Sequence, residues 1–137
     1  MEIFLTIISG VFVFIVSQII IERIIKPKNE FRKLKGKIIC YITMHGRYIA
    51  NPLYFRDKKD EEYDLYWNAS CDLRLIASEF AGHLECYPHV CRKKKYSTVV
   101  NNLMRISNNI ILMCGERDLI EDNEKLDEEI RKIFNMH

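Results

Sequence analysis

The feature that most constrains this chain is an unbroken run of 19 uncharged residues near its start, Ile3–Ile21. A helix rises about 1.5 Å per residue, so the run would extend about 29 Å, close to the hydrocarbon thickness of a bilayer. A cleaved signal peptide would need a basic start, a shorter apolar stretch and a small-residue cleavage site. The chain begins Met-Glu, and we therefore expect a retained transmembrane helix.

Positive charge follows this span directly. Seven of the 15 residues from Arg23 to Lys37 are Lys or Arg, whereas the other flank carries only Glu2 and the terminal amine. The positive-inside rule then places the N-terminus outside and the rest of the chain in the cytoplasm. The same charges favour anionic lipid headgroups, and the expected membrane-surface basic residues are Arg23, Lys26, Lys28, Arg32, Lys33, Arg92, Lys93, Lys94 and Lys95.

Cysteine content and net charge narrow the class of protein. Five cysteines, an odd number without the spacing of a small disulfide scaffold, indicate a reducing compartment. The formal net charge of +2 gives no general affinity for polyanions, so we expect no nucleic-acid partner.

Small side chains recur on one side of the span. Spacings of four, three and four residues place Thr6, Gly10, Val13 and Ser17 on a single stripe of the helix. Small residues let two helices approach closely in lipid, which predicts self-association into a homo-oligomer. The alternative is chance, because Gly and Ser are common in spans.

Beyond the span, apolar residues recur at the period of an α-helix, and no segment shows the alternation of a half-buried strand. Pro27 is expected to end or kink the first helix, with Asn29 as the next cap, and Ser97 and Gly115 are expected to bound a later helix. The expected helices cover residues 29–51, 62–84, 97–115 and 122–134.

This pattern predicts an all-α fold in two parts. Residues 1–28 form a transmembrane anchor and juxtamembrane turn, and residues 29–137 form a cytoplasmic antiparallel up-and-down bundle of three long helices plus a short C-terminal helix. The topology places Arg92–Lys95 near the bilayer and the acidic residues Asp60, Glu61, Glu62, Glu116, Asp118 and Glu121 at the far end. The alternative is that these are ordinary solvated loop charges.

Three groups of residues are candidates for chemistry. The donors His83, Cys86, His89 and Cys91 have the types that zinc prefers, but a site closed from one short segment is unusual, so no metal is expected. His45 is a lone histidine on an apolar face, where a hydrogen-bonded core role is commoner than catalysis. A buried or half-buried polar cluster is expected from Asn51, Arg74, Ser107 and Asn108, either fixing register or recognising a ligand.

Several motifs of known enzymes are missing from the sequence. It has no Gly-rich phosphate loop, no nucleophile elbow and no His-Glu-x-x-His, so neither catalysis nor a cofactor is expected. A bundle-type hydrolase assembled from separate helices stays open as an alternative.

Four segments that follow the span resemble those of a known group of proteins. The stretches FRKLKGKI (31–38), YIANP (48–52), LRLIASEF (73–80) and LMRISNNI (103–110) resemble a family of small bacterial single-pass inner-membrane proteins without an assigned activity. The resemblance implies a bacterial inner-membrane protein with a helical cytoplasmic domain. The recurring polar positions of that family correspond here to Asn51, Arg74, Ser78, Ser107 and Asn108.

Two functions from different classes fit these expectations. The first is a membrane-anchored module whose helical bundle binds a protein partner or a second copy of itself. The second is a self-assembling membrane effector, in which the bundle senses a signal and the span oligomerises to perturb the bilayer.

Overall fold

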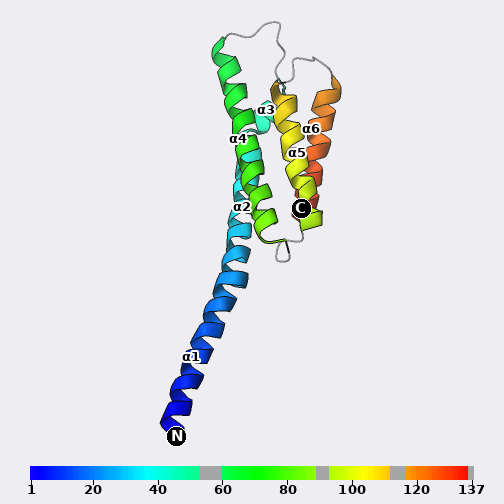
Figure 1. The fold of residues 1–137 in the computed structure, drawn as a ribbon. Coiled ribbons are helices and arrows are strands. Elements are labelled where there is room, and N and C mark those ends of the chain that lie inside the picture. Colours follow the sequence, from blue (N-terminus) through cyan, green and yellow to red (C-terminus); the bar gives the residue numbers. More distant parts are fainter. Residues whose placement is uncertain (53–59, 89–92, 112–116, 136–137) are drawn as a thin grey trace.

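The fold is described by a computed structural model that covers residues 1–52, 60–88, 93–111 and 117–135. All regular structure in these residues is helical, so the predicted all-α class is confirmed. The elements are α1 Glu2–Ile20, a π-helical turn Ile21–Ile25, α2 Lys26–Met44, α3 Gly46–Ala50, α4 Asp60–Cys86, α5 Lys93–Ile111 and α6 Arg117–Ile133 (Figure 1).

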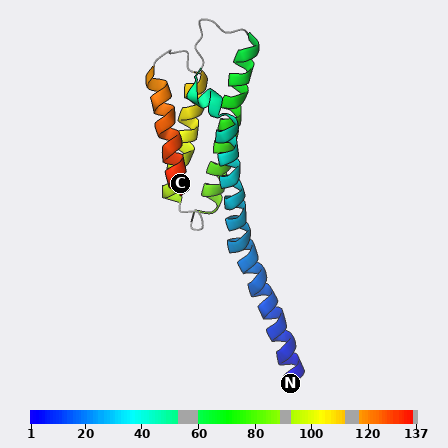
Figure 2. The same cartoon turned by 180° about the vertical axis from the view of Figure 1, so that it is seen from behind.

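The first elements form one continuous helix from Ile3 to Met44, 42 residues long. Its N-terminal half is long and apolar enough to cross a membrane, and none of that apolar stretch is buried against the rest of the protein. Figures 1 and 2 show α1 extending beyond the other helices, while α2 lies beside them. A single helix therefore carries both the candidate span and one wall of the packed core.

The helix does not end at Pro27, so of the two outcomes expected there, an end or a kink, the end is wrong. Proline removes a backbone donor, and its ring clashes with the carbonyl four residues earlier, here Arg23. Arg23 lies in the wider π-helical turn, where the Lys26 N–H donates to the carbonyl of Ile21, five residues back. This turn accommodates Pro27 in the first turn of α2, and Asn29 lies inside that helix rather than capping it.

The next expected helix, 29–51, is interrupted at His45. The backbone of this residue has φ −94° and ψ 8°, outside the helical region, and α3 starts afresh at Gly46. The stop expected at Asn51 and Pro52 is confirmed, since α3 ends at Ala50. The interruption lets the short α3 turn away from α2 and contact α5 and α6.

The remaining helices lie side by side, with α4 packed against α2, α5 against α4, and α6 against α5 (Figures 1 and 2). The core consists of residues at helical spacing on their facing sides. Fully buried aliphatic and aromatic side chains include Ile38, Leu73, Ile76, Phe80, Val99, Leu103, Ile106, Ile110 and Ile130. We call α2 to α6 the helical body.

The later helices also differ from the sequence prediction at their ends. Ser97 is not a cap, because α5 already begins at Lys93 and the Ser97 hydroxyl donates to the carbonyl of Lys94. The last helix is not short: α6 has 17 residues against 19 in α5. Its polar surface is lined by ion pairs four residues apart, which extend a helix without adding apolar periodicity: Glu121–Lys125, Asp127–Arg131 and Glu128–Lys132.

The core packing predicts how two neighbouring residues of α4 respond to truncation. Ile76 is fully buried, whereas Leu75 is 54% exposed. We expect Ile76→Ala to lower the free energy of unfolding by about 2–5 kcal/mol, because it removes buried methyl groups and leaves a cavity. The matched control Leu75→Ala should change it by less than about 0.5 kcal/mol.

Urea unfolding of the full chain in detergent, followed by the fluorescence of the single tryptophan, Trp67, and by circular dichroism, measures both changes. Equal effects of the two substitutions would contradict the packing described for α4.

Candidate functional site

Three of the four residues of the predicted polar cluster meet between α4 and α5. Arg74 Nε donates to Ser107 Oγ at 3.2 Å, and Arg74 Nη2 donates to Asn108 Oδ1 at 2.7 Å. Ser70 Oγ, beneath them, donates to the carbonyl oxygen of Ser107 at 2.8 Å. Arg74, Ser107 and Asn108 are called the seam cluster below.

The fourth predicted member lies elsewhere. Asn51 is exposed at the end of α3, and its side-chain amide donates to the carbonyl oxygen of Arg47 at 3.3 Å. Asn51 therefore closes the last turn of its own helix, and the structure does not bring it to the seam cluster.

The charge of Arg74 is not neutralised by the groups that hold it. Both side-chain acceptors, a hydroxyl and an amide oxygen, are neutral. Among the carboxylates that the structure describes, none forms an ion pair with Arg74. The half-buried guanidinium is thus held in one orientation by neutral partners, and it retains its full positive charge.

A second polar cluster, which the sequence analysis missed, joins α5 and α6 to α3. Asn109 Nδ2 donates to Asn123 Oδ1 at 2.9 Å and to Asp122 Oδ2 at 2.9 Å. Asn123, fully buried, donates in turn to the carbonyl oxygen of Ile49 at 2.9 Å. Arg105 binds both oxygens of Asp122, at 2.8 and 3.0 Å.

One signal in the sequence could have revealed this cluster. Asn102 and Asn109 are seven residues apart, so they lie on the same face of α5 as its apolar residues. Both are buried, and Asn102 donates to Glu129 Oε2 at 2.8 Å. A buried asparagine at heptad spacing often fixes the register of packed helices, and here both tie α5 to α6.

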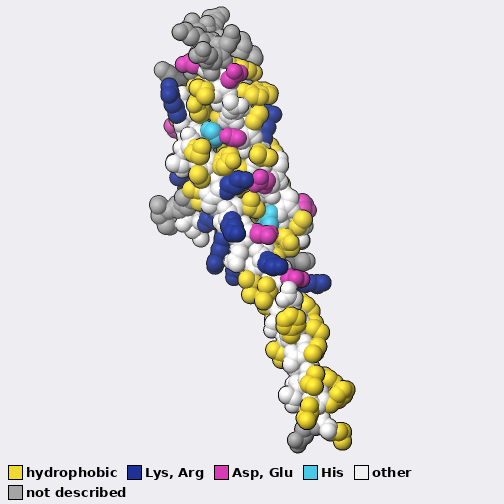
Figure 3. Space-filling model, turned by 90° about the vertical axis from the view of Figure 1, so that its left-hand side faces the viewer, with side chains coloured by type: hydrophobic (Ala, Val, Ile, Leu, Met, Phe, Trp, Pro, Cys, Tyr) yellow, Lys and Arg dark blue, Asp and Glu magenta, His cyan; other side chains and the backbone are white. Residues whose placement is uncertain are grey.

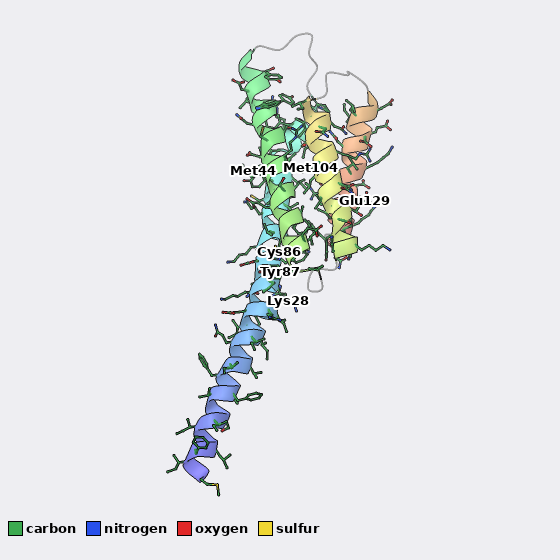
Figure 4. The ribbon with its side chains drawn as sticks, viewed as in Figure 1. Lys28, Met44, Cys86, Tyr87, Met104 and Glu129 are labelled. Atoms are coloured by element: carbon green, nitrogen blue, oxygen red, sulfur yellow. The ribbon has the colours of Figure 1, made fainter. Side chains whose placement is uncertain are left out.

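A cavity of about 520 Å³ lies between α2 and the end of α4. His83 contributes to its wall, with Nε2 donating to the carbonyl oxygen of Pro27 at 3.1 Å and Nδ1 lying 3.8 Å from Glu30. Cys86 and Tyr87, labelled in Figure 4, line the same cavity. The contact with Pro27 attaches the end of α4 to the first turn of α2.

Of the four weak metal-ligand candidates, His83 and Cys86 share this cavity, whereas His89 and Cys91 lie outside the described residues. Within the described ranges, no three His, Cys, Asp or Glu side chains gather in a way that could hold a metal ion.

Two further polar contacts join α2 to α4. His45, the lone histidine of the apolar face, is buried and lies 3.1 Å from Asp72 Oδ2. Lys37 donates to Glu79 Oε2 at 2.6 Å, and this hydrogen bond is the main cause that raises the pKa of Lys37 above its ordinary value. Lys37 is therefore protonated throughout the neutral range.

The predicted basic residues on α2 lie next to the start of α5. The rings of Phe31 and Tyr96 are 4.9 Å apart, which brings Lys93, Lys94 and Lys95 beside the first turns of α2. Lys93 is paired with Glu85 at 2.7 Å, and Arg92 lies outside the described residues. Figure 3 shows Lys and Arg side chains, with carboxylates between them, where the apolar helix joins the helical body.

The small residues of the span, Thr6, Gly10, Val13 and Ser17, are all exposed on α1. Ser17 Oγ donates to the carbonyl oxygen of Val13 at 2.7 Å, so this hydroxyl is satisfied within the helix. A Cβ added at Gly10 would meet no atom within 4 Å.

The buried asparagine cluster predicts a loss of stability without any change at the surface. We expect Asn123→Ala to lower the free energy of unfolding by about 1–3 kcal/mol, because the Ile49 carbonyl and the Asn109 amide lose a partner while buried. The control Asn101→Ala, at an exposed position of α5, should stay within about 0.5 kcal/mol of wild type. Urea denaturation of the full chain checks both, and an unchanged Asn123→Ala midpoint would contradict the described hydrogen bonds.

Comparison of the chain with protein-family models, with curated proteins and with solved structures found no match. What the chain does is therefore inferred from its own contacts, burial and charge.

Proposed function

We propose that the chain is a single-pass bacterial inner-membrane protein whose cytoplasmic helical body is a non-catalytic module for protein interaction. The observation that carries this proposal is the continuous helix Ile3–Met44, exposed and apolar in its first half and packed against α4 in its second. A fully apolar exposed helix is costly in water but favourable in lipid. The helical body is thereby joined to a membrane anchor without a flexible linker.

In this proposal α2, α4, α5 and α6 form an antiparallel up-and-down bundle. The pairwise contacts support it, since each long helix packs on the one before it. Contacts between segments far apart in the sequence support it too, such as His83 on Pro27 at one level and His45 beside Asp72 at another. As residue numbers fall along α2 they rise along α4, as expected for helices that run in opposite directions.

Anionic lipid headgroups are the first proposed partner. Pro27 lies six residues beyond Ile21, about 9 Å along the helix, and the headgroup layer is about 5–8 Å thick on each side. Arg23, Lys26 and Lys28 then stand at or just above this layer, whereas Arg32 and Lys33, about 17 and 18 Å beyond Ile21, stand further out. Lys93 lies near the level of Pro27, because it pairs with Glu85 two residues after His83. Each basic residue near such a surface contributes about 1 kcal/mol of attraction.

Exposed apolar side chains on the helical body support a protein partner. Large hydrophobic residues that stay 44–65% exposed are Met44, Leu65, Trp67 and Leu75. Exposed aromatic and aliphatic groups of this kind are enriched where proteins bind one another. Figure 3 shows yellow side chains among the charged ones on one face of the helical body, and Met44 is labelled in Figure 4.

The proposed orientation predicts where native cysteines react. Cys40, Cys71 and Cys86 are exposed on the helical body, and the span contains no cysteine. We expect a membrane-impermeant maleimide to label the full chain in inverted membrane vesicles but not in intact spheroplasts, because the basic flank holds the body in the cytoplasm. Labelling is measured by the mass shift of the purified protein.

The matched control is a variant with all five cysteines replaced by serine and Glu2→Cys added, which should be labelled in spheroplasts and not in inverted vesicles. Labelling of the native cysteines in spheroplasts would show the opposite orientation and would contradict a cytoplasmic module.

The membrane effector is the second candidate, favoured by the exposed stripe of small residues and by the open space at Gly10. The two candidates differ in what the reconstituted protein does to a vesicle. For the interaction module we expect wild-type protein and Gly10→Leu alike to retain an entrapped dye. Leakage by wild type that is lost in Gly10→Leu, but kept in the off-stripe control Ile15→Leu, would establish the effector instead.

A further inference from the structure

The cavity of about 520 Å³ between α2 and the end of α4 holds two hydrogen-bond acceptors that face each other. His83 is buried, and its Nε2 carries a hydrogen, because it donates to the carbonyl oxygen of Pro27, which can only accept. In the neutral ring Nδ1 then has a lone pair and no hydrogen. This atom lies 3.8 Å from Glu30 Oε2, and an ionised carboxylate is also only an acceptor. The two facing atoms therefore lack a donor between them.

The charge of Glu30 is not neutralised by a neighbouring Lys or Arg. Among the ion pairs of the described residues, none joins Glu30 to either type of side chain. Glu79 also lines the cavity, but it is already paired with Lys37 at 2.6 Å. A ligand that brings a positive charge and N–H donors would therefore satisfy Glu30 and His83 together.

The rest of the wall leaves room for a ligand. Leu34, Cys86 and Tyr87 give the cavity an apolar part. Gly82 lies in the same wall, and a Cβ added there would meet no described atom within 4 Å. The volume is in the range of ligand cavities, roughly 300–1,000 Å³.

We propose that this cavity binds a primary ammonium group, which donates to His83 Nδ1 and to the Glu30 carboxylate. A primary ammonium has several N–H donors, so it can bind both acceptors at once. A quaternary ammonium has the same charge but no N–H, and it cannot. The aminoethyl phosphate group has the required amine, and it occurs both as a lipid headgroup and in soluble molecules.

The height of the cavity fits a lipid source, a step that rests on the proposed membrane anchoring. Pro27, to which His83 is bonded, stands about 9 Å beyond Ile21. Cys86 follows His83 by three residues, about 4.5 Å nearer the bilayer along α4 (Figure 4). This end of the cavity then reaches the headgroup layer, and the amine is the outermost part of an upright aminoethyl phosphate headgroup.

Lys33 distinguishes the lipid source from a soluble one. It also lines the cavity, and it takes part in none of the ion pairs of the described residues. Lys33 stands about 18 Å beyond Ile21, too far for the phosphate of a lipid that stays in the bilayer. A soluble aminoalkyl phosphate has no such limit, so its phosphate can pair with Lys33 while its amine binds Glu30.

Protection of Cys86 from a maleimide tests the site with the full chain in phosphatidylcholine nanodiscs. Cys86 lines the cavity, whereas Cys40 and Cys71 are exposed elsewhere on the helical body and serve as internal controls. Replacing half of the lipid by phosphatidylethanolamine should slow the reaction of Cys86 at least about threefold, because a bound headgroup covers the thiol. The rates at Cys40 and Cys71 should not change. Mass spectrometry of the peptides measures each rate.

The soluble arm uses the same nanodiscs without phosphatidylethanolamine. Phosphoethanolamine is added to one sample and phosphocholine, which lacks the N–H donors, to the other. If the source is soluble, phosphoethanolamine alone protects Cys86, and Lys33→Gln weakens its binding at least about threefold. If the source is the lipid, Lys33→Gln leaves the protection by phosphatidylethanolamine unchanged.

Two variants remove the site in different ways. Glu30→Gln keeps the size of the side chain but loses its charge, and should weaken the binding of the amine at least about tenfold. Gly82→Leu fills the cavity, and should abolish the difference between the ethanolamine and choline compounds. The matched controls are Glu124→Gln, an exposed carboxylate on α6, and Gly36→Leu, an open glycine of α2 outside the cavity; both should behave as wild type.

Protection by either ethanolamine compound that is lost in Glu30→Gln supports the site, and the arm that shows it identifies the source. Equal effects of the ethanolamine and choline compounds, no protection in either arm, or protection unchanged in Glu30→Gln would overturn it. So would ¹⁵N NMR that finds the His83 ring protonated at neutral pH, because Nδ1 would then be a donor. Each of these failures leaves the interaction module intact, since its orientation is measured separately by the labelling of inverted vesicles and spheroplasts.

Discussion

The structure depends on how one helix continues past a proline. Pro27 cannot donate a backbone hydrogen bond, and in the interior of a regular helix it would kink or end the helix between its apolar and its packed segments. The π-helical turn Ile21–Ile25 just before it removes this conflict, and the carbonyl oxygen of Pro27 also accepts a hydrogen bond from His83. The residue expected to separate the anchor from the body instead marks the level at which α4 is attached to α2.

Polar contacts between the helices determine which helices are neighbours, which the apolar core alone does not. Apolar side chains pack well in several registers, whereas a buried amide that loses its partner is costly in every register but one. Asn109 and Asn123 specify how α5, α6 and the short α3 meet, and His45 with Asp72 specifies the contact of α2 with α4. Arg74 differs, because its neutral partners orient the guanidinium while leaving its charge available.

Periodicity in the sequence predicts helices and their buried faces well, because a core face needs only apolar residues at the right spacing. Leu73, Ile76 and Phe80 lie in the core as expected. Three of the four residues of the predicted polar cluster, Arg74, Ser107 and Asn108, meet between α4 and α5. The sequence left two outcomes open at Pro27, an end or a kink, because the choice depends on the hydrogen bonding of the preceding turn. The break at His45 and the length of α6 were missed because tertiary contacts of α3 and charged pairs on α6 leave no trace in an apolar pattern.

In the proposed membrane anchoring, the unbroken helix would transmit tilt from its apolar half to the helical body. In a bilayer, a span longer or shorter than the hydrocarbon layer adjusts by tilting. With no joint between α1 and α2, tilt of the first becomes tilt of the second, and α2 is about 29 Å long. A change of about 10° would then displace the end of α2 by about 5 Å, so for a membrane-anchored chain the thickness of the lipid would determine how far sideways that end reaches.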